Sequence, residues 1–165
     1  MTALLGIDLG ERRIGVALAD DPAAGARPLI TLRRGKTVDA EVAALRHLID
    51  AYDVTEVIVG LPLEAAGHEG AQAAATRAWV GSVAKGLGDR VVIGLRDERL
   101  TSHVAETRLG PMSRGRSGGP PSRTQRDDYR ARVDREAAAI ILQDELDSRR
   151  ATGTAQTRPT METTP

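Results

Sequence analysis

Three acidic residues that lie far apart in the sequence could form one catalytic centre. Asp8 stands inside the apolar run of residues 3–9, Glu98 follows the apolar run of residues 91–95, and Asp134 flanks the apolar stripe of the last predicted helix. Carboxylate oxygens are hard ligands that suit Mg²⁺ or Mn²⁺, and such ions can activate water for phosphodiester hydrolysis. We therefore expect Asp8, Glu98 and Asp134 to be catalytic, metal-binding residues.

Asp8 is the most informative of the three acids. Burying an unpaired carboxylate costs several kcal/mol, so an acid within an apolar strand needs a partner, a metal ion or a function. Alternatively, Asp8 could cap the turn that starts at Gly10. Asp134 also has an ordinary alternative role, because an acid near the start of a helix interacts favourably with the positive end of the helix dipole.

Glu98 lies in a segment that is charged throughout, so its role is open. It could form a surface ion pair with Arg96 or Arg99 instead of binding a metal ion. Asp97 competes with it for the catalytic role, because neighbouring residues of an extended chain point to opposite sides. His103 could assist proton transfer near Glu98, but a solvated helix position is the simpler interpretation.

The elements that must position these acids follow from the hydropathy pattern. Three apolar runs joined by short connections predict an antiparallel meander, and alternating helical and strand patterns follow it. The strands are predicted at residues 3–9, 14–19, 27–34, 57–59 and 91–95, and the helices at 38–52, 71–87, 104–109 and about 130–148. This order predicts an α/β fold with a five-stranded mixed sheet flanked by helices, in one domain covering residues 1–150.

Two segments lack this periodicity. Residues 111–126 are rich in Pro, Gly, Ser and Arg and contain no acidic residue, so we expect a flexible basic loop over residues 111–128. Its arginines could contact phosphates, or the loop could be a surface insertion without a ligand. Residues 151–165 are polar and are predicted to form a disordered tail.

The composition excludes several function classes. The chain has no Cys, so disulfides, thiolate metal sites and Cys nucleophiles are excluded. Aromatic residues make up only 2% of it, so nucleic acid would be bound through backbone charge and shape rather than by stacking of bases. The short first apolar run is neither a signal sequence nor a membrane span, so we expect a cytoplasmic protein without a membrane partner.

The chain resembles the YqgF or RuvX family of Holliday-junction resolvases and pre-16S ribosomal RNA nucleases. The resemblance covers roughly residues 3–147, and its segments occur in the family's order. The matching segments are GIDLG and RIGVA at residues 6–10 and 13–17, IVGLPL at 58–63 with Gly67, DERLTS at 97–102, and the pattern VD, AA and ILQ within 133–143. The DERLTS segment after GLPL is the most specific of these.

The resemblance implies an RNase H-like fold in which Asp8, Glu98 and Asp134 correspond to the acids that bind Mg²⁺ or Mn²⁺. Basic positions of the family match Arg13 and Arg99, although Arg99 could instead pair with Asp97. With the basic loop, the expected nucleic-acid-binding residues are Arg13, Arg99, Arg114, Arg116 and Arg123.

The implied activity is hydrolysis of phosphodiester bonds by a metal-dependent nuclease. RNA is the preferred substrate, in processing of the 5′ end of pre-16S ribosomal RNA, with Holliday junctions or other structured DNA as a second possibility. The protein would act as a monomer or a homodimer. One alternative is a non-catalytic RNA-binding or ribosome-assembly factor on the same fold. Another is an actin-like ATPase, whose phosphate-binding turn resembles residues 8–10, but no second glycine-rich phosphate loop is found.

Overall fold

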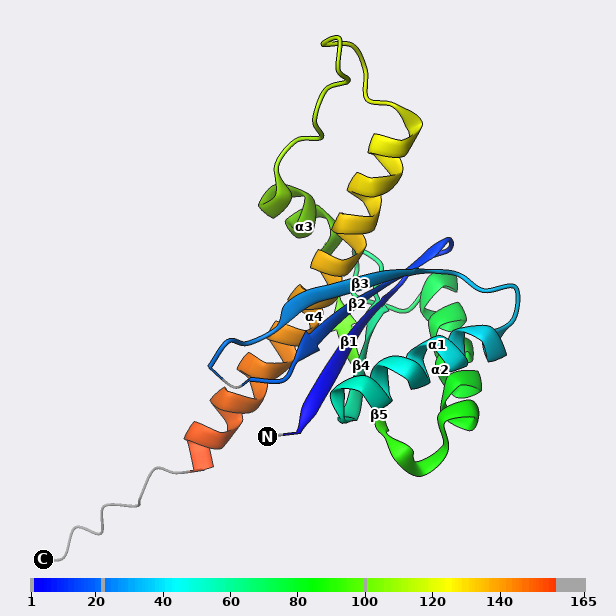
Figure 1. Ribbon diagram of the computed structural model, residues 1–165. Coiled ribbons are helices and arrows are strands. Elements are labelled where there is room, and N and C mark those ends of the chain that lie inside the picture. Colours follow the sequence, from blue (N-terminus) through cyan, green and yellow to red (C-terminus); the bar gives the residue numbers. More distant parts are fainter. Residues whose placement is uncertain (1, 22, 100, 157–165) are drawn as a thin grey trace, which may run out of the picture.

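The computed structural model describes residues 2–21, 23–99 and 101–156. It contains a five-stranded mixed sheet in the order β3-β2-β1-β4-β5, flanked by helices, as predicted (Figure 1). The strands are β1 (Ala3–Leu9), β2 (Arg13–Ala19), β3 (Arg27–Arg33), β4 (Val54–Pro62) and β5 (Val92–Glu98). The helices are α1 (Val38–Tyr52), α2 (Ala71–Leu87), the short 3₁₀ helix η1 (Gly88–Arg90), α3 (Thr101–Leu109) and α4 (Arg123–Gln156).

The central strand β1 joins the two halves of the sheet. It pairs antiparallel with β2 and parallel with β4, which in turn pairs parallel with β5. The carboxyl ends of β1, β4 and β5 therefore meet at one edge of the sheet, where ligands commonly bind in α/β proteins. Asp8 lies near the end of β1, and Glu98 is the last residue of β5 rather than a residue beyond it.

Alternation along the strands divides the apolar side chains between two layers. On β1, Leu5 and Ile7 join the core beneath α1 and α2, whereas Leu4 joins the core beneath α4. Figure 1 shows α1 and α2 on one face of the sheet and α4 across the other. Asp8 shares the α4 face with Leu4, because successive strand residues point to opposite sides.

The last helix is longer at both ends than predicted. It begins at Arg123 rather than near residue 130, so residues 123–128 of the predicted loop are helical. The overlooked signal is a capping box. The Gln125 backbone N–H donates to Ser122 Oγ at 3.2 Å, and the Ser122 N–H donates to Gln125 Oε1 at 2.8 Å.

The other end of α4 corrects the predicted tail. The helix continues to Gln156, so residues 151–156 are helical, and residues 157–165 lie outside the described residues. Arg149 ties this end to the sheet, because its guanidinium donates to Glu56 on β4 at 2.7 Å and to Glu145 at 2.8 Å. None of the described helices is long and apolar enough to cross a membrane.

A small third core attaches α3 to α4. Ala105 of α3 packs against Val133, Ala137 and Ile140 of α4. The loop over residues 110–122 and the first turns of α4 extend with α3 beyond the sheet (Figure 1). This arm therefore projects from the side of the molecule that carries Asp134.

Candidate active site

Asp8 and Asp134 approach each other through a glycine on β2. Asp8 is paired in register with Gly15, and a Cβ atom at Gly15 would collide with the backbone carbonyl of Asp134. Because Gly15 has no side chain, α4 packs directly on the strand next to β1. The close approach of helix and sheet thus brings a residue of the last helix beside the first strand.

Glu98 reaches the same place from the edge strand. Arg96, two residues earlier, faces α4, because its Nη1 lies 2.9 Å from Glu145 Oε2, and Glu98 therefore shares this face. The carboxylate of Glu98 occupies the space that a side chain at Gly60 of β4 would fill. Glu98 thus leans across β4 in the direction of β1.

Asp97 points to the other side of the sheet. There its charge raises the pKa of Arg77 on α2, in addition to the effect of the hydrogen bond that Arg77 donates to Glu69. Of the two neighbouring acids, the structure therefore directs Glu98 and not Asp97 to the face that carries Asp8.

The pKa of Asp8 reflects the nearness of the other two acids. Burial raises the pKa of Asp8 to about 8, and the charges of Glu98 and Asp134 act in the same direction. Burial also raises the pKa of Glu98, while a hydrogen bond with Thr101 opposes this effect. Both carboxylates therefore resist ionisation in the absence of a nearby positive charge.

Asp8 and Glu98 line one cleft of about 180 Å³ at the carboxyl edge of the strands. The remaining lining residues are Leu9, Pro62, Leu63, Gln72, Thr101 and Ser102. Two carboxylates and several hydroxyl or amide groups form a polar pocket suited to a hydrated cation.

Asp134 forms an ion pair with Arg13. The Arg13 Nε lies 2.5 Å from Asp134 Oδ2, and the two side chains are 24% and 21% exposed. Within the described part of the chain, no group of three or more His, Cys, Asp or Glu side chains could hold a metal ion. The oxygens of Asp8 and Glu98 fit a divalent cation, whereas one oxygen of Asp134, Oδ2, is engaged by Arg13.

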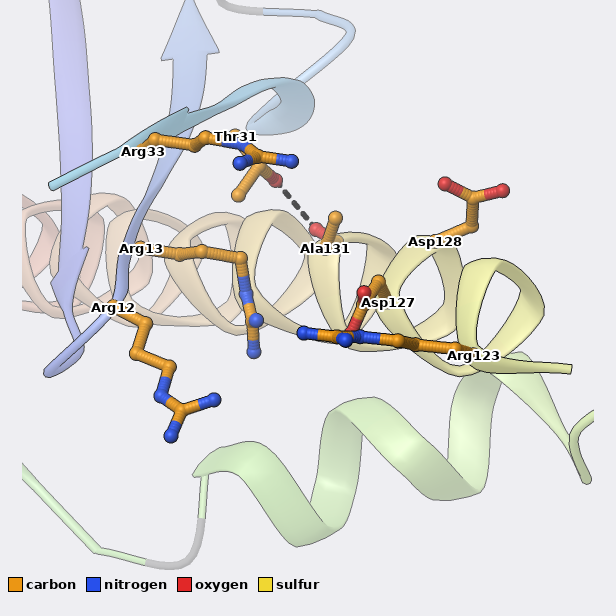
Figure 2. Close-up of a pocket in the computed structure, with 8 residues that line it drawn as sticks. All are labelled: Arg12, Arg13, Thr31, Arg33, Arg123, Asp127, Asp128 and Ala131. Atoms are coloured by element: carbon orange, nitrogen blue, oxygen red, sulfur yellow. Dashed lines mark hydrogen bonds between the residues drawn. The ribbon is translucent and has the colours of Figure 1, made fainter.

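The expected nucleic-acid-binding arginines lie in three different places. Arg13 and Arg123 line the same cavity beside the acids (Figure 2). Arg99 packs against Gly67 in the loop after β4, and Arg114 and Arg116 are exposed on the loop between α3 and α4. His103 is also exposed, on α3.

Several residues that shape the site are not evident from the sequence. Thr101 is 6% exposed and forms a side-chain hydrogen bond with Glu98. Gly15 and Gly60 belong to the segments that resemble the family, but the space that each leaves for an acid is a tertiary feature. A glycine inside a strand was the available signal, since it commonly marks a close approach of another group.

We expect Gly60→Ala to impair the site more than the fold. The new methyl group would meet the Glu98 carboxylate and Ile141 Cδ1, which are ends of flexible side chains that can move. Because a displacement of about 1 Å can reduce catalysis about 100-fold, cleavage should fall by roughly that factor. Rate measurements and thermal melting would check this.

A matched control is Gly81→Ala on α2, where a Cβ atom would meet nothing within 4 Å. This control should retain full activity. Equal activity of the Gly60 and Gly81 variants would contradict the placement of Glu98 over Gly60.

Comparison with known proteins gives a consistent family assignment. The family described as "RuvX: Holliday junction resolvase" matches residues 2–148. A protein of Anaeromyxobacter sp. (strain Fw109-5), named "Putative pre-16S rRNA nuclease", is 44% identical over 147 residues, covering 89% of this chain and 98% of the relative. A protein of Nocardioides sp. (strain ATCC BAA-499 / JS614) with the same name is 40% identical over 156 residues, or 92% and 91% of the two chains.

The fold is also similar to that of a solved structure. "T. thermophilus RuvC in complex with Holliday junction substrate" superposes with a TM-score of 0.51, covering 92% of this chain and 98% of that one. The sequence identity is 17%, so this likeness concerns the fold alone. The predicted RNase H-like architecture is confirmed.

Proposed function

This chain belongs to the RuvX family of Holliday junction resolvases, and from that premise we propose that it is a nuclease that uses Mg²⁺ or Mn²⁺ to hydrolyse phosphodiester bonds. The observation that carries the proposal is the shared environment of three acids. Asp8 at the end of β1 has a pKa raised to about 8 by burial and by the charges of Glu98 and Asp134. Such clustered acids are typical of a site that receives positive charge.

The residues of the site have distinct roles in this proposal. Asp8 and Glu98 would hold the cation in their common cleft, and the Thr101 hydroxyl would orient Glu98. Arg13 neutralises Asp134. Its guanidinium could move from Asp134 to a phosphate of the substrate. The bound cation would supply an activated water and positive charge for the transition state.

The proposed substrate is the 5′ end of pre-16S ribosomal RNA. The protein would act on it in the cytoplasm. The names of the relatives at 36–44% identity support RNA, and the family description supports four-way DNA junctions as a second substrate. A junction resolvase needs two symmetric active sites, and hence a homodimer, whereas RNA processing requires only a monomer.

Cleavage assays with three kinds of substrate would test the proposal. Labelled precursor RNA, a four-way DNA junction and plain duplex DNA would each be incubated with Mg²⁺, Mn²⁺ or EDTA. We expect cleavage with a divalent cation and none with EDTA. The cation should also stabilise the folded protein, by about 2.7 kcal/mol at a concentration of 100 times its dissociation constant.

Two outcomes would contradict this function. Undiminished cleavage in EDTA would exclude the metal-dependent mechanism. Binding of RNA without cleavage or metal-induced stabilisation would favour the alternative, a non-catalytic ribosome-assembly factor.

A further inference from the structure

A cavity of about 380 Å³ shares Arg13 with the proposed site, but its other lining residues have no role in the proposed chemistry. It is enclosed by the turn between β1 and β2, by β3 and by the first turns of α4 (Figure 2). Its lining residues are Arg12, Arg13, Thr31, Arg33, Arg123, Asp127, Asp128 and Ala131, which we call the arginine cavity. The Thr31 hydroxyl donates to the Ala131 carbonyl at 2.5 Å and joins β3 to α4 across it.

The arginine cavity carries an excess of positive charge, because four arginines and two aspartates line it. In Figure 2, the guanidinium groups of Arg12, Arg13 and Arg123 extend into a common space from two different elements. Arg13 is paired with Asp134, but Arg12, Arg33 and Arg123 form no ion pair within the part of the chain that the structure describes. Like charges held together are stabilised by an anion that enters between them.

Two acids in the lining do not cancel this charge. Asp127 lies beside Arg123, and the carboxylate of Asp128 points away from the three converging guanidinium groups (Figure 2). Neither acid forms an ion pair with a described residue. The electrostatic potential in the open space between Arg12, Arg13 and Arg123 is therefore positive.

The chemistry of the lining selects phosphate rather than a nucleobase. Among the described residues, no aromatic side chain lines the cavity, so it offers no ring on which a base could stack. Tyr129 follows the lining residue Asp128 in the sequence, but it packs against the small core between α3 and α4. Its hydroxyl donates to the Gly110 carbonyl at 2.8 Å. The planar fork of several guanidinium groups matches the oxygens of a phosphodiester.

The arginine cavity adjoins a second hollow that is lined by one of the three acids, Asp134. A neighbouring hollow of about 370 Å³ is lined by Gly10, Glu11, Arg12, Arg13, Arg130 and Asp134. Arg12 and Arg13 thus border both hollows, and Asp134 belongs to the electrostatic environment of Asp8. The second hollow therefore links the arginine cavity with Asp134.

We propose that the arginine cavity binds a backbone phosphate of the nucleic acid other than the one being cut, and holds it independently of base sequence. This inference rests on the proposed function. Arg12 and Arg123 are the phosphate ligands, Arg33 is a rim residue on β3, and Arg13 connects this phosphate site to the acidic centre.

Binding measurements under conditions that prevent cleavage test the proposal. A fluorescently labelled nucleic-acid duplex would be titrated with the full chain in the presence of EDTA, at several salt concentrations. The titration would be repeated with a second duplex of unrelated base sequence. The variant Arg12→Gln/Arg123→Gln removes two exposed charges. Its matched control, Lys36→Gln/Lys85→Gln, removes the same charge at two exposed positions away from the cavity.

We expect the arginine variant to bind at least about tenfold more weakly at low salt, equally for both sequences. The slope of log K against log salt concentration should fall by about 1 for each phosphate that the variant no longer neutralises. The lysine control should retain the affinity and slope of the unsubstituted protein. Melting curves would verify that both variants are folded.

Equal affinities and slopes for the two variants would overturn the phosphate site. Cleavage by the unsubstituted protein would in that case leave the proposed nuclease function intact. Failure of the unsubstituted protein both to bind and to cleave would instead reject the proposed function, and the phosphate site with it.

Discussion

Asp8→Asn is expected to slow cleavage strongly while making the metal-free protein more stable. Asp8 and Glu98 share the cleft that would hold the cation, and the amide is a much weaker ligand than the carboxylate. Since a metal ion supplies several kcal/mol of transition-state stabilisation, the cleavage rate should fall on the order of 1,000-fold. Initial rates with RNA and with junction DNA would measure this effect.

The opposite effect on stability follows from the pKa of Asp8. Burial and the charges of Glu98 and Asp134 raise this pKa from 3.8 to about 8, so the folded protein retains a proton that the unfolded chain releases. The contribution of the Asp8 carboxyl group to the free energy of unfolding is therefore fully present below pH 3.8. It declines as the pH rises towards 8. Because Asn carries no charge, the variant should avoid this decline and melt at a higher temperature at a pH of about 7–8.

The matched control for this experiment is Asp97→Asn. It removes the same charge next to Glu98, but its side chain points to the α2 side of the sheet. This control should keep cleavage activity near that of the unsubstituted protein. An Asp8→Asn variant that cuts normally, or that melts at a lower temperature than the unsubstituted protein, would contradict the assignment of Asp8.

Glu41→Ala is expected to destabilise the fold strongly. Glu41 is 3% exposed and accepts hydrogen bonds from Arg34 Nε at 2.6 Å, Trp79 Nε1 at 2.6 Å and the Gly35 N–H at 3.0 Å. Loss of one partner of a buried ion pair costs about 3–5 kcal/mol, and the lower end applies because the Arg34 side chain is 30% exposed. The melting temperature should fall on the order of 10 °C.

The same substitution should loosen the turn beside the active site. Arg34 Nη1 donates to the Gly10 carbonyl at 2.9 Å, and Gly10 lies shortly before Arg12 and Arg13, which line the arginine cavity. Glu41 therefore acts through Arg34 as a positioning residue. Glu106→Ala on α3, an exposed position, is the control and should change the melting temperature little.

The stabilisation by Glu41 should depend on pH. Burial alone would raise the pKa of Glu41, but the hydrogen bonds from Arg34, Trp79 and Gly35 and the charge of Arg34 outweigh it and lower the pKa below 4.5. The stabilisation is thus fully present above pH 4.5 and is lost as the pH falls through the lower folded-state pKa. Denaturation curves of both proteins at several pH values would show their stabilities converging in acid; a constant difference would contradict this role.

Much of the scaffold could be predicted from local patterns. Short apolar runs and helical spacing predicted five strands and the helices, and the position of Asp8 inside an apolar run marked it as unusual. These inferences succeed because side-chain periodicity along a strand or helix is a local property. The resemblance to the RuvX family, based on short segments in a fixed order, added the RNase H-like architecture.

The composition of the site depended on contacts between distant segments. Periodicity placed Glu98 and Asp97 on opposite faces, but only the packing of α4 decided which face carries the acids. The ion pair between Arg13 and Asp134, the space at Gly60, and the convergence of Arg12 and Arg123 likewise join residues from separate elements. Local sequence therefore determined which residues share a face, whereas tertiary packing determined what each face meets, because that depends on the arrangement of the whole chain.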